Sequence, residues 1–121
     1  LSETFVGDAA LEHLAQLPSL AWLDLWHTQV TDAGMAALAK VKSLQYLRLT
    51  DTPVGDAGME HLAKLPALET LDLELTKVTD KSVQHLKQLS GLKRLVLTQS
   101  EMTEKGVAEL RKALPKCQIV F

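Results

Sequence analysis

The stretch LAWLDLWHTQVTDAGMAALAKVKS, residues 20–43, decides the fold because the chain repeats it. The pattern returns 24 residues later as LQYLRLTDTPVGDAGMEHLAKLPA, then as LETLDLELTKVTDKSVQHLKQLSG, and it begins again at residue 92. A fixed period over most of a chain indicates stacked structural units rather than one compact globule. We therefore predict a single repeat domain over 1–121, with a partial repeat at 1–19, repeats at 20–43, 44–67, 68–91 and 92–115, and a terminal strand at 116–121.

Composition places the chain among ordinary small domains. It has 121 residues, a formal net charge of -2 and one cysteine, Cys117. A nucleic-acid binder would show a strong clustered excess of Lys and Arg, and no such excess is present, so we expect no nucleic-acid partner. No apolar run is long enough to span a bilayer, and we expect no membrane segment. A single cysteine forms no internal disulfide, which favours a reducing compartment such as the cytoplasm.

The first residues fall inside a repeat whose strand portion is missing. The chain opens at Leu1 without Met, and on the repeat Thr4 aligns with Thr28 and Val6 with Val30. We interpret the chain as a fragment. Because stability in repeat arrays comes from interfaces between neighbouring repeats, an uncovered half-repeat exposes apolar surface, and we expect either a missing capping segment or self-association through the exposed end.

Each unit begins with the pattern of a half-buried strand. Leu20, Leu23 and Leu25 alternate with variable residues at the end of the segment, which is the period of a strand with one face buried. These positions recur as Leu44, Leu47, Leu49, Leu68, Leu71, Leu73, Leu92, Leu95 and Leu97, and the last two recur as Ile119 and Phe121. Since the units are in register, the strands are expected to lie parallel, and the chain is expected to end on a strand.

A hydroxyl residue follows each strand at one fixed place, before a buried aliphatic residue. The hydroxyl column reads Thr4, Thr28, Thr52, Thr76 and Ser100. The aliphatic column reads Val6, Val30, Val54, Val78 and Met102. Because a buried turn leaves backbone groups in need of partners, we expect the hydroxyls to bond the turns above and below them.

A helix start follows in every unit. Hydroxyl or acidic side chains there are expected to cap free N–H groups and to face the positive end of the helix dipole. The pairs are Thr31-Asp32, Gly55-Asp56, Thr79-Asp80 and Thr103-Glu104. Two places later the residue is always small, which predicts close packing against the next backbone, and the column reads Ala10, Gly34, Gly58, Ser82 and Gly106. Apolar residues then follow at spacings of three and four, as in Met35, Leu38 and Val41, which predicts a helix with one buried stripe.

The pattern L-x-x-L-x-L-x-x-T-x-V-T-D-x-G-M-x-x-L-A-x-L resembles leucine-rich repeats, most closely the short bacterial kind and the repeats that follow F-box motifs. It departs from many of them in one column, where Thr or Ser stands in place of Asn or Cys. The resemblance implies an α/β fold, a right-handed solenoid with a parallel β-sheet on the concave face and α-helices on the convex face. It also implies a role in binding other proteins.

Function is expected where the repeat is free to vary. The variable strand positions point away from the helices and form columns across the sheet. Of the chain's two Trp, one Tyr and two Phe, three aromatic residues lie there, and exposed Trp, Tyr and Arg are the types that carry binding hot spots. The candidate partner-binding residues are Trp22, Asp24, Trp26, His27, Tyr46, Arg48, Asp51, Asp72, Glu74 and Arg94.

Two interpretations stay open for these residues. The aromatic cluster either binds a partner or packs locally, including against a preceding repeat. For the column of Asp24, Arg48 and Asp72 we favour cross-strand ion pairs that support the sheet. The sequence thus predicts a protein–protein interaction module that uses its concave sheet, and the alternative is a structural or self-associating assembly segment without a discrete ligand site.

Catalytic and metal sites find little support. His13, His61 and His85 share one helical position in the repeat. Two neighbouring imidazoles would offer two metal ligands, but no carboxylate or thiolate accompanies them to complete a usual site. His27 is expected near Asp24 and Asp51, yet no Ser or Cys nucleophile accompanies it. We therefore predict no enzyme activity, no metal and no cofactor, and we expect Cys117 to be a small core or edge residue.

Overall fold

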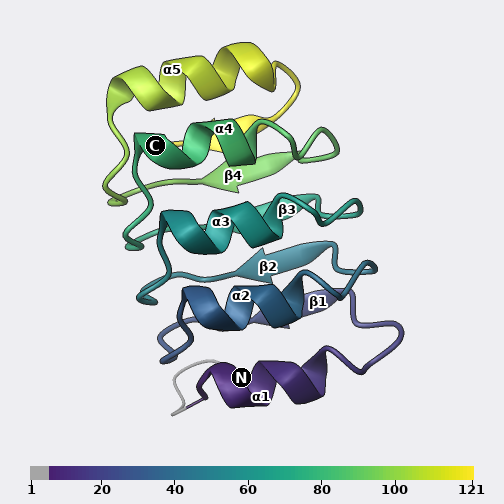
Figure 1. Ribbon diagram of the computed structural model, residues 1–121. Helices are drawn as coiled ribbons and strands as arrows, with labels where there is room; N and C mark the ends of the chain where they lie inside the picture. Colours follow the sequence, from purple (N-terminus) through teal and green to yellow (C-terminus); the bar gives the residue numbers. More distant parts are fainter. Residues whose placement is uncertain (1–5) are drawn as a thin grey trace.

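The computed structural model describes residues 6–121, which form a sheet layer and a helix layer along one stack (Figure 1). Thr4, the first member of the predicted hydroxyl column, lies outside the described residues. Five short strands form one parallel sheet in sequence order. They are β1 (Trp22–Asp24), β2 (Tyr46–Arg48), β3 (Thr70–Asp72), β4 (Arg94–Val96) and β5 (Gln118–Val120). The predicted parallel pairing is confirmed.

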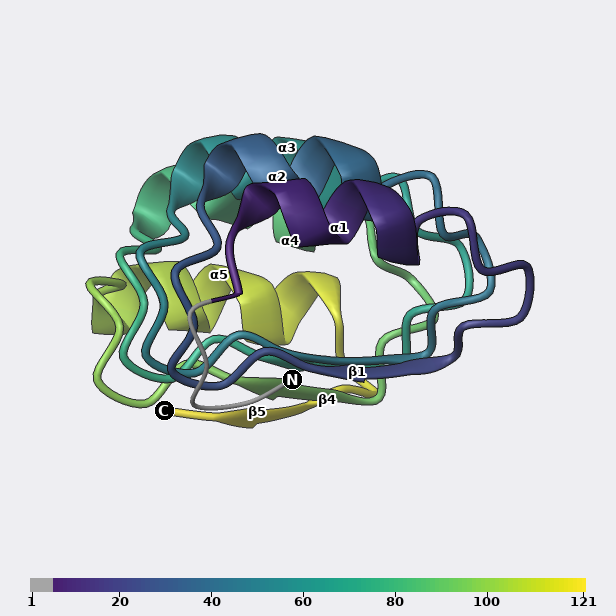
Figure 2. The same cartoon turned by 90° about the horizontal axis from the view of Figure 1, so that it is seen from below.

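The helices pack side by side on one face of this sheet and leave its other face uncovered (Figure 2). They are α1 (Asp8–Leu14), α2 (Asp32–Leu38), α3 (Asp56–Leu62), α4 (Val83–Leu86) and α5 (Glu104–Ala113). The repeat at 68–91 differs because a short 3-10 helix, η1 (Asp80–Ser82), precedes α4. The predicted alternation of strand, turn and helix is therefore observed in each full repeat.

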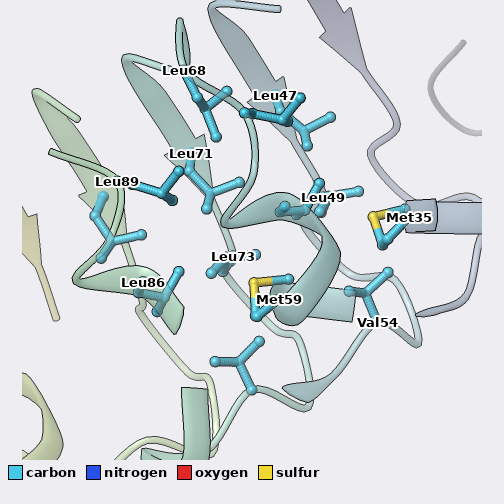
Figure 3. Packing of buried hydrophobic residues seen from close by; sticks show 14 of the residues in the cluster. Met35, Leu47, Leu49, Val54, Met59, Leu68, Leu71, Leu73, Leu86 and Leu89 are labelled. Carbon is cyan, nitrogen blue, oxygen red and sulfur yellow. The ribbon is translucent and has the colours of Figure 1, made fainter. Parts of the chain in front are cut away.

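The core lies between the two layers and consists of the residues that the repeat fixes. Leu47, Leu49, Leu71 and Leu73 are fully buried and meet the helix residue Met59 in the interior (Figure 3). Each such side chain contributes about 1.5–3 kcal/mol when it leaves water. The helix stripe predicted by the spacing of three and four is confirmed, since Met35, Leu38 and Val41 are all buried.

The hydroxyl column is buried at Thr28, Thr52 and Thr76, but its predicted bonding was wrong. The hydroxyl of Thr28 donates to the carbonyl of Leu25 at 2.8 Å, within its own turn. Thr52 and Thr76 do the same at 2.7 Å to the carbonyls of the leucines three residues before them. The turn is tight enough to return each hydroxyl to the strand it has just left, so neighbouring turns are joined by backbone bonds instead.

Those backbone bonds come from residues in an unusual conformation. One residue in each turn has a positive φ of 52 to 57° although it is not glycine, and the set is His27, Asp51, Leu75 and Gln99. The N–H groups of the first three donate to the next turn, at 3.0, 2.9 and 3.1 Å. A left-handed residue is uncommon outside glycine, and here the bond to the neighbouring repeat holds it in place.

The aspartates at the helix starts bind the next repeat rather than their own helix. The backbone N–H and hydroxyl of Thr31 donate to Asp8 at 2.7 and 2.5 Å, and those of Thr103 donate to Asp80 at 2.8 and 2.5 Å. We call the four carboxylates that act in this way the aspartate ladder, and its members are Asp8, Asp32, Asp56 and Asp80. The expectation of an acidic cap on the same helix is corrected, whereas the expected hydroxyl caps are confirmed at Thr31, Thr79 and Thr103.

The column of small residues makes room for this ladder. A Cβ at Gly58 would lie 2.7 Å from Oδ1 of Asp32, and Cβ atoms at Gly34 and Gly106 would meet the carboxylates of Asp8 and Asp80. The predicted close approach is real, but the neighbour is the carboxylate of the preceding repeat and not a backbone. Each small residue thus leaves the space that the aspartate of the preceding repeat occupies.

Candidate functional site

The open face of the sheet carries the side chains that vary between repeats, and we call it the sheet face. Strand register brings together the residues predicted to form columns, such as Trp22 with Tyr46 and Asp24 with Arg48. One residue from each strand forms a line across the sheet, which we call the first row. Its members are Trp22, Tyr46, Thr70, Arg94 and Gln118. The second row runs as Asp24, Arg48, Asp72, Val96 and Val120. The repeat period alone was enough to predict both rows.

Trp22 and Tyr46 form a stacked aromatic pair at one end of the first row. Their ring centroids lie 4.7 Å apart with an angle of 11° between the planes. Trp22 is 59% exposed although its side chain is large and apolar, while Tyr46 is half-buried. Burial raises the pKa of the Tyr46 phenol, and the nearby carboxylates of Asp24 and Asp72 act in the same direction. The stack therefore presents a flat, rigid apolar surface to solvent.

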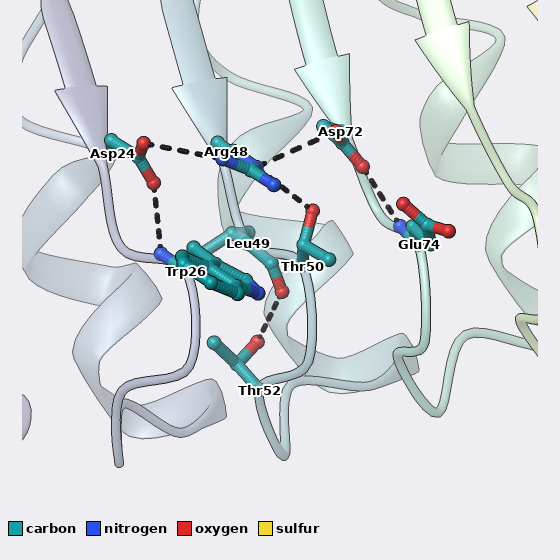
Figure 4. A network of polar contacts seen from close by, with 8 residues as sticks. All are labelled: Asp24, Trp26, Arg48, Leu49, Thr50, Thr52, Asp72 and Glu74. Atoms are coloured by element: carbon teal, nitrogen blue, oxygen red, sulfur yellow. Dashed lines mark hydrogen bonds and ion pairs between the residues drawn. The ribbon is translucent and has the colours of Figure 1, made fainter. Parts of the chain in front are cut away.

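Arg48 sits at the centre of an ionic network in the second row (Figure 4). Its Nη1 lies 3.5 Å from Oδ2 of Asp24, and its Nε lies 3.8 Å from Oδ2 of Asp72. The same Nε donates to the Thr50 hydroxyl at 3.2 Å, and the guanidinium lies 5.1 Å from the ring centroid of Trp26. Arg48 is thus held on every side by groups of this chain.

The two aspartates of this network also fix the strand ends. Oδ1 of Asp24 accepts the backbone N–H of Trp26 at 2.9 Å, and Oδ1 of Asp72 accepts that of Glu74 at 3.0 Å. The geometry agrees with the interpretation of cross-strand ion pairs that support the sheet. Two positions on this face are covered, since Thr50 is 3% and Val96 is 8% exposed.

His27 and Asp51 pair at the turn edge of the sheet face. Nδ1 of His27 lies 2.6 Å from Oδ2 of Asp51, and the two side chains are 64% and 48% exposed. The sequence placed His27 near both Asp24 and Asp51, and the structure pairs it with Asp51. Leu75, 46% exposed, occupies the same turn position in the next repeat.

Arg94 differs from Arg48 although both lie on the sheet face. Its side chain is exposed, and its Nη1 contacts only the neutral amide oxygen of Gln118, at 3.2 Å. Within residues 6–121 no carboxylate forms an ion pair with Arg94. The adjacent Lys93 is neutralised by Glu69, with Nζ 3.0 Å from Oε2. The first row thus carries, on β4, a positive charge that no ion pair within residues 6–121 compensates.

The part of the chain that the structure describes also bears on metal, membrane and thiol chemistry. No group of three or more His, Cys, Asp or Glu residues is placed there to hold a metal ion. No helix in the same region is long and apolar enough to cross a membrane. His61 and His85 are half-buried, and Cys117 is half-buried with the pKa of its thiol raised by burial. Cys117 lies beside a shallow hollow of about 170 Å³ between the ends of α4 and α5.

Comparison with known families decides what kind of repeat this is. The family model described as Leucine Rich repeat matches residues 17–39 and 42–63. Over these two segments the chain is similar to leucine-rich repeats. The resemblance noted in the sequence is therefore confirmed, and leucine-rich repeats generally bind other proteins and are typically not enzymes. Among curated proteins, no sequence matches the chain.

Solved structures confirm the fold. A leucine-rich repeat protein of Leptospira interrogans has a TM-score of 0.67 and 24% identity, over 91% of this chain and 33% of that chain. Two internalins of Listeria monocytogenes, inlF and inlC2, have TM-scores of 0.57 each, with identities of 18% and 24%. The matches cover 90% and 91% of this chain, and 36% and 54% of the internalins. The α/β leucine-rich repeat solenoid is thus established, and this chain spans about a third to a half of the length of these structures.

Proposed function

We propose that this chain is a protein-interaction module that holds its partner on the sheet face. The observation that carries the proposal is the Trp22–Tyr46 stack, with Trp22 left 59% exposed. Tryptophan and tyrosine supply much of the binding energy in protein interfaces. An aromatic pair held open on a rigid sheet is a ready contact surface, because little ordering is needed when the partner arrives.

The surroundings of the stack support this proposal. Both aromatic residues stand on strands whose backbones are hydrogen-bonded in register, with Tyr46 N–H donating to the carbonyl of Ala21 at 2.9 Å. Beside them the Arg48 network is internally paired and therefore keeps its shape. The sheet face is consequently preorganised over its first two strands.

The test is a selection for binders on the purified chain. Random displayed peptides of about ten residues are long enough in extended form to cross strands spaced about 4.8 Å apart. We expect the selected peptides to lose at least about tenfold in affinity on Trp22→Ala and on Tyr46→Ala. Circular dichroism should stay unchanged for Trp22→Ala because this side chain lies mostly in solvent.

A matched variant on the helix side controls for general effects. Arg111 is exposed on α5, away from the sheet, so Arg111→Ala should leave the affinity of the selected peptides unchanged. Peptides that bind the wild-type chain and both aromatic variants equally well would show that the sheet face is not the binding surface.

The second candidate function is assembly through the ends of the stack. It is favoured by Leu17, 47% exposed after α1, and by Phe121, 47% exposed after β5. If this function holds, the sedimentation mass rises with concentration and Leu17→Glu returns the chain to monomer. A monomer mass at all concentrations would contradict it.

A further inference from the structure

The first row carries two features that differ in chemistry, the exposed Trp22–Tyr46 stack and Arg94, which has no ion-pair partner among residues 6–121. From them we infer that the partner presents an apolar side chain to the Trp22–Tyr46 stack and a carboxylate to Arg94. This inference rests on the proposed binding through the sheet face and names the chemistry of the partner segment. The remaining members of the row, Thr70 and Gln118, are neutral and flank Arg94 in register.

The second row does not offer such a site, because its charges are already paired. Arg48 lies between Asp24 and Asp72 at 3.5 and 3.8 Å, and its guanidinium stacks over Trp26. A partner carboxylate that approached Arg48 would have to displace one of these contacts. The charge of Arg48 is therefore already paired within the chain, whereas Arg94 has no ion-pair partner among residues 6–121.

Arg94 is the cation available to a partner. It is exposed and contacts only the amide oxygen of Gln118, at 3.2 Å, and no described carboxylate lies within ion-pair distance of it. A guanidinium binds a carboxylate through two parallel hydrogen bonds, and its planar fork makes this geometry specific. The neutral Gln118 contact is easily exchanged, so a carboxylate is the group that Arg94 fits best.

The spacing of the row sets the length of the recognised segment. Tyr46 on β2 and Arg94 on β4 stand two strands apart in the same row. Two strand spacings are about 10 Å, and an extended peptide advances about 3.3 Å per residue. A peptide crossing the strands therefore reaches both groups when its acidic residue lies about three positions from its apolar residue.

Anionic groups of other kinds fit the same face less well. A nucleic-acid backbone carries closely spaced phosphates. The neighbouring strand β3 ends in Asp72, and Glu74 follows in the turn, so carboxylates also stand on this part of the sheet face. A segment with one acidic residue avoids the repulsion that a continuous row of phosphates would meet there.

The experiment repeats the peptide selection on the wild-type chain and on Arg94→Glu. From the wild-type chain we expect peptides that share an aromatic or aliphatic residue with Asp or Glu about three positions away. In the peptides selected on the Arg94→Glu chain we expect Lys or Arg at the position where the wild-type chain selects Asp or Glu. Arg111→Glu, an equal charge change on the helix side, should select the same acidic peptides as the wild-type chain.

Paired synthetic peptides then give the size of the effect. A selected peptide and its Glu→Lys counterpart should differ by about tenfold or more in affinity for the wild-type chain, in favour of the acid. Arg94→Glu should reverse this order. Raising the salt concentration should narrow the difference, because the contact lies at an exposed site.

The outcomes separate this inference from the proposed function. Peptides that depend on Trp22 but show no acidic preference, or keep it in Arg94→Glu, would overturn the inference and leave the proposed function standing. Peptides that bind independently of Trp22 would overturn both. Selection of acidic peptides that depend on both Trp22 and Arg94 supports both.

Discussion

Asp56 receives two hydrogen bonds from Thr79, one from the backbone N–H at 2.9 Å and one from the hydroxyl at 2.6 Å. Thr79 caps the next helical segment, so this carboxylate joins the start of one helix to the start of the next. Ser82 donates a further hydrogen bond to Asp56. Hydrogen bonds to an ionised carboxylate are stronger than hydrogen bonds between neutral groups. The aspartate ladder therefore stabilises the contact between neighbouring repeats in addition to the leucine core.

The ladder has one weaker joint, where Gly55 replaces the capping threonine. Gly55 donates only its backbone N–H to Asp32, at 2.7 Å. A Cβ there would lie 3.7 Å from Cβ of Lys77 and 3.8 Å from Oδ2 of Asp32, which is ordinary contact. We predict that Gly55→Thr raises the free energy of unfolding by about 1 kcal/mol, because the new hydroxyl bonds Asp32. Urea denaturation measures the change.

The control for this variant is Gly55→Ala. Alanine also restricts the unfolded chain but brings no hydroxyl to the carboxylate. The threonine variant should therefore be more stable than the alanine variant. If the two variants have equal stability, the missing hydroxyl does not explain the weaker joint.

Gly58 is predicted to tolerate no side chain despite its place in a helix. Alanine is favoured over glycine in helices by about 1 kcal/mol. A Cβ at Gly58 would nevertheless lie 2.7 Å from Oδ1 of Asp32 and 2.9 Å from Cγ of Met35. We expect Gly58→Ala to lower the free energy of unfolding by about 1–3 kcal/mol, as overpacking does.

Gly91 provides the comparison, since a Cβ there meets its nearest neighbour, the carbonyl oxygen of Pro66, at 3.8 Å. Gly91→Ala should thus change the urea midpoint little. An unchanged or raised midpoint for Gly58→Ala would show that Asp32 does not need the space beside Gly58.

The ladder also predicts how stability depends on pH. Hydrogen bonds from the Thr103 hydroxyl and backbone N–H hold the pKa of Asp80 below its ordinary value of 3.8. Partial burial opposes ionisation of Asp56, but hydrogen bonds from Ser82 and Thr79 also bring its pKa below 3.8. Because the unfolded chain binds these protons first, the stabilisation is present above pH 3.8 and is lost as the pH falls through the lowered native values.

Urea midpoints measured from neutral to acidic pH check this prediction. The wild-type midpoint should fall steeply below the ordinary aspartate pKa, and a variant with Asp56→Asn and Asp80→Asn should start lower and fall less. Parallel curves for the two chains would contradict the role of these carboxylates.

The local structure of the repeat could be predicted from the sequence, whereas the joints between repeats could not. The leucine spacing predicted the strands, and the 24-residue period placed Trp22 beside Tyr46. The hydrogen-bond partner of Asp56 was missed because the sequence pattern is the same whether a carboxylate at a helix start accepts hydrogen bonds from its own helix or from a neighbouring repeat. Only the three-dimensional stack shows that Thr79 lies within 2.9 Å of it.

The same limit applies to the candidate site. The 24-residue period placed Arg48 between Asp24 and Asp72, but the contact of Arg94 with the Gln118 amide could not be predicted from it. The left-handed turn position was also missed, because His27 and Leu75 carry no glycine signal. Both features depend on side-chain and turn geometry across repeats rather than on local pattern.

Tyr46 gives a direct probe of the aromatic stack because it is the only tyrosine. Burial raises its pKa above the ordinary 10.0, so we expect its phenol to ionise at higher pH in the folded chain than in urea. The folded state binds this proton more tightly, and stability therefore falls as the pH rises above 10.0. Ultraviolet difference spectra follow the phenolate.

Removal of Trp22 should expose Tyr46 and bring its pKa back towards the ordinary value. An unchanged titration curve in Trp22→Ala would show that the stack does not shield the phenol. Lys77→Ala, at an exposed position outside the rows, is the matched control and should not shift the curve.

The central claim is that a partner segment lies on the Trp22–Tyr46 stack of the sheet face. The most direct measurement follows the two tryptophan indole N–H signals by NMR while a selected peptide is added to the chain. The account predicts that the Trp22 signal shifts on binding and that the Arg94→Glu chain shows a smaller shift with an acidic peptide. Saturable binding that leaves the Trp22 signal unmoved would contradict it.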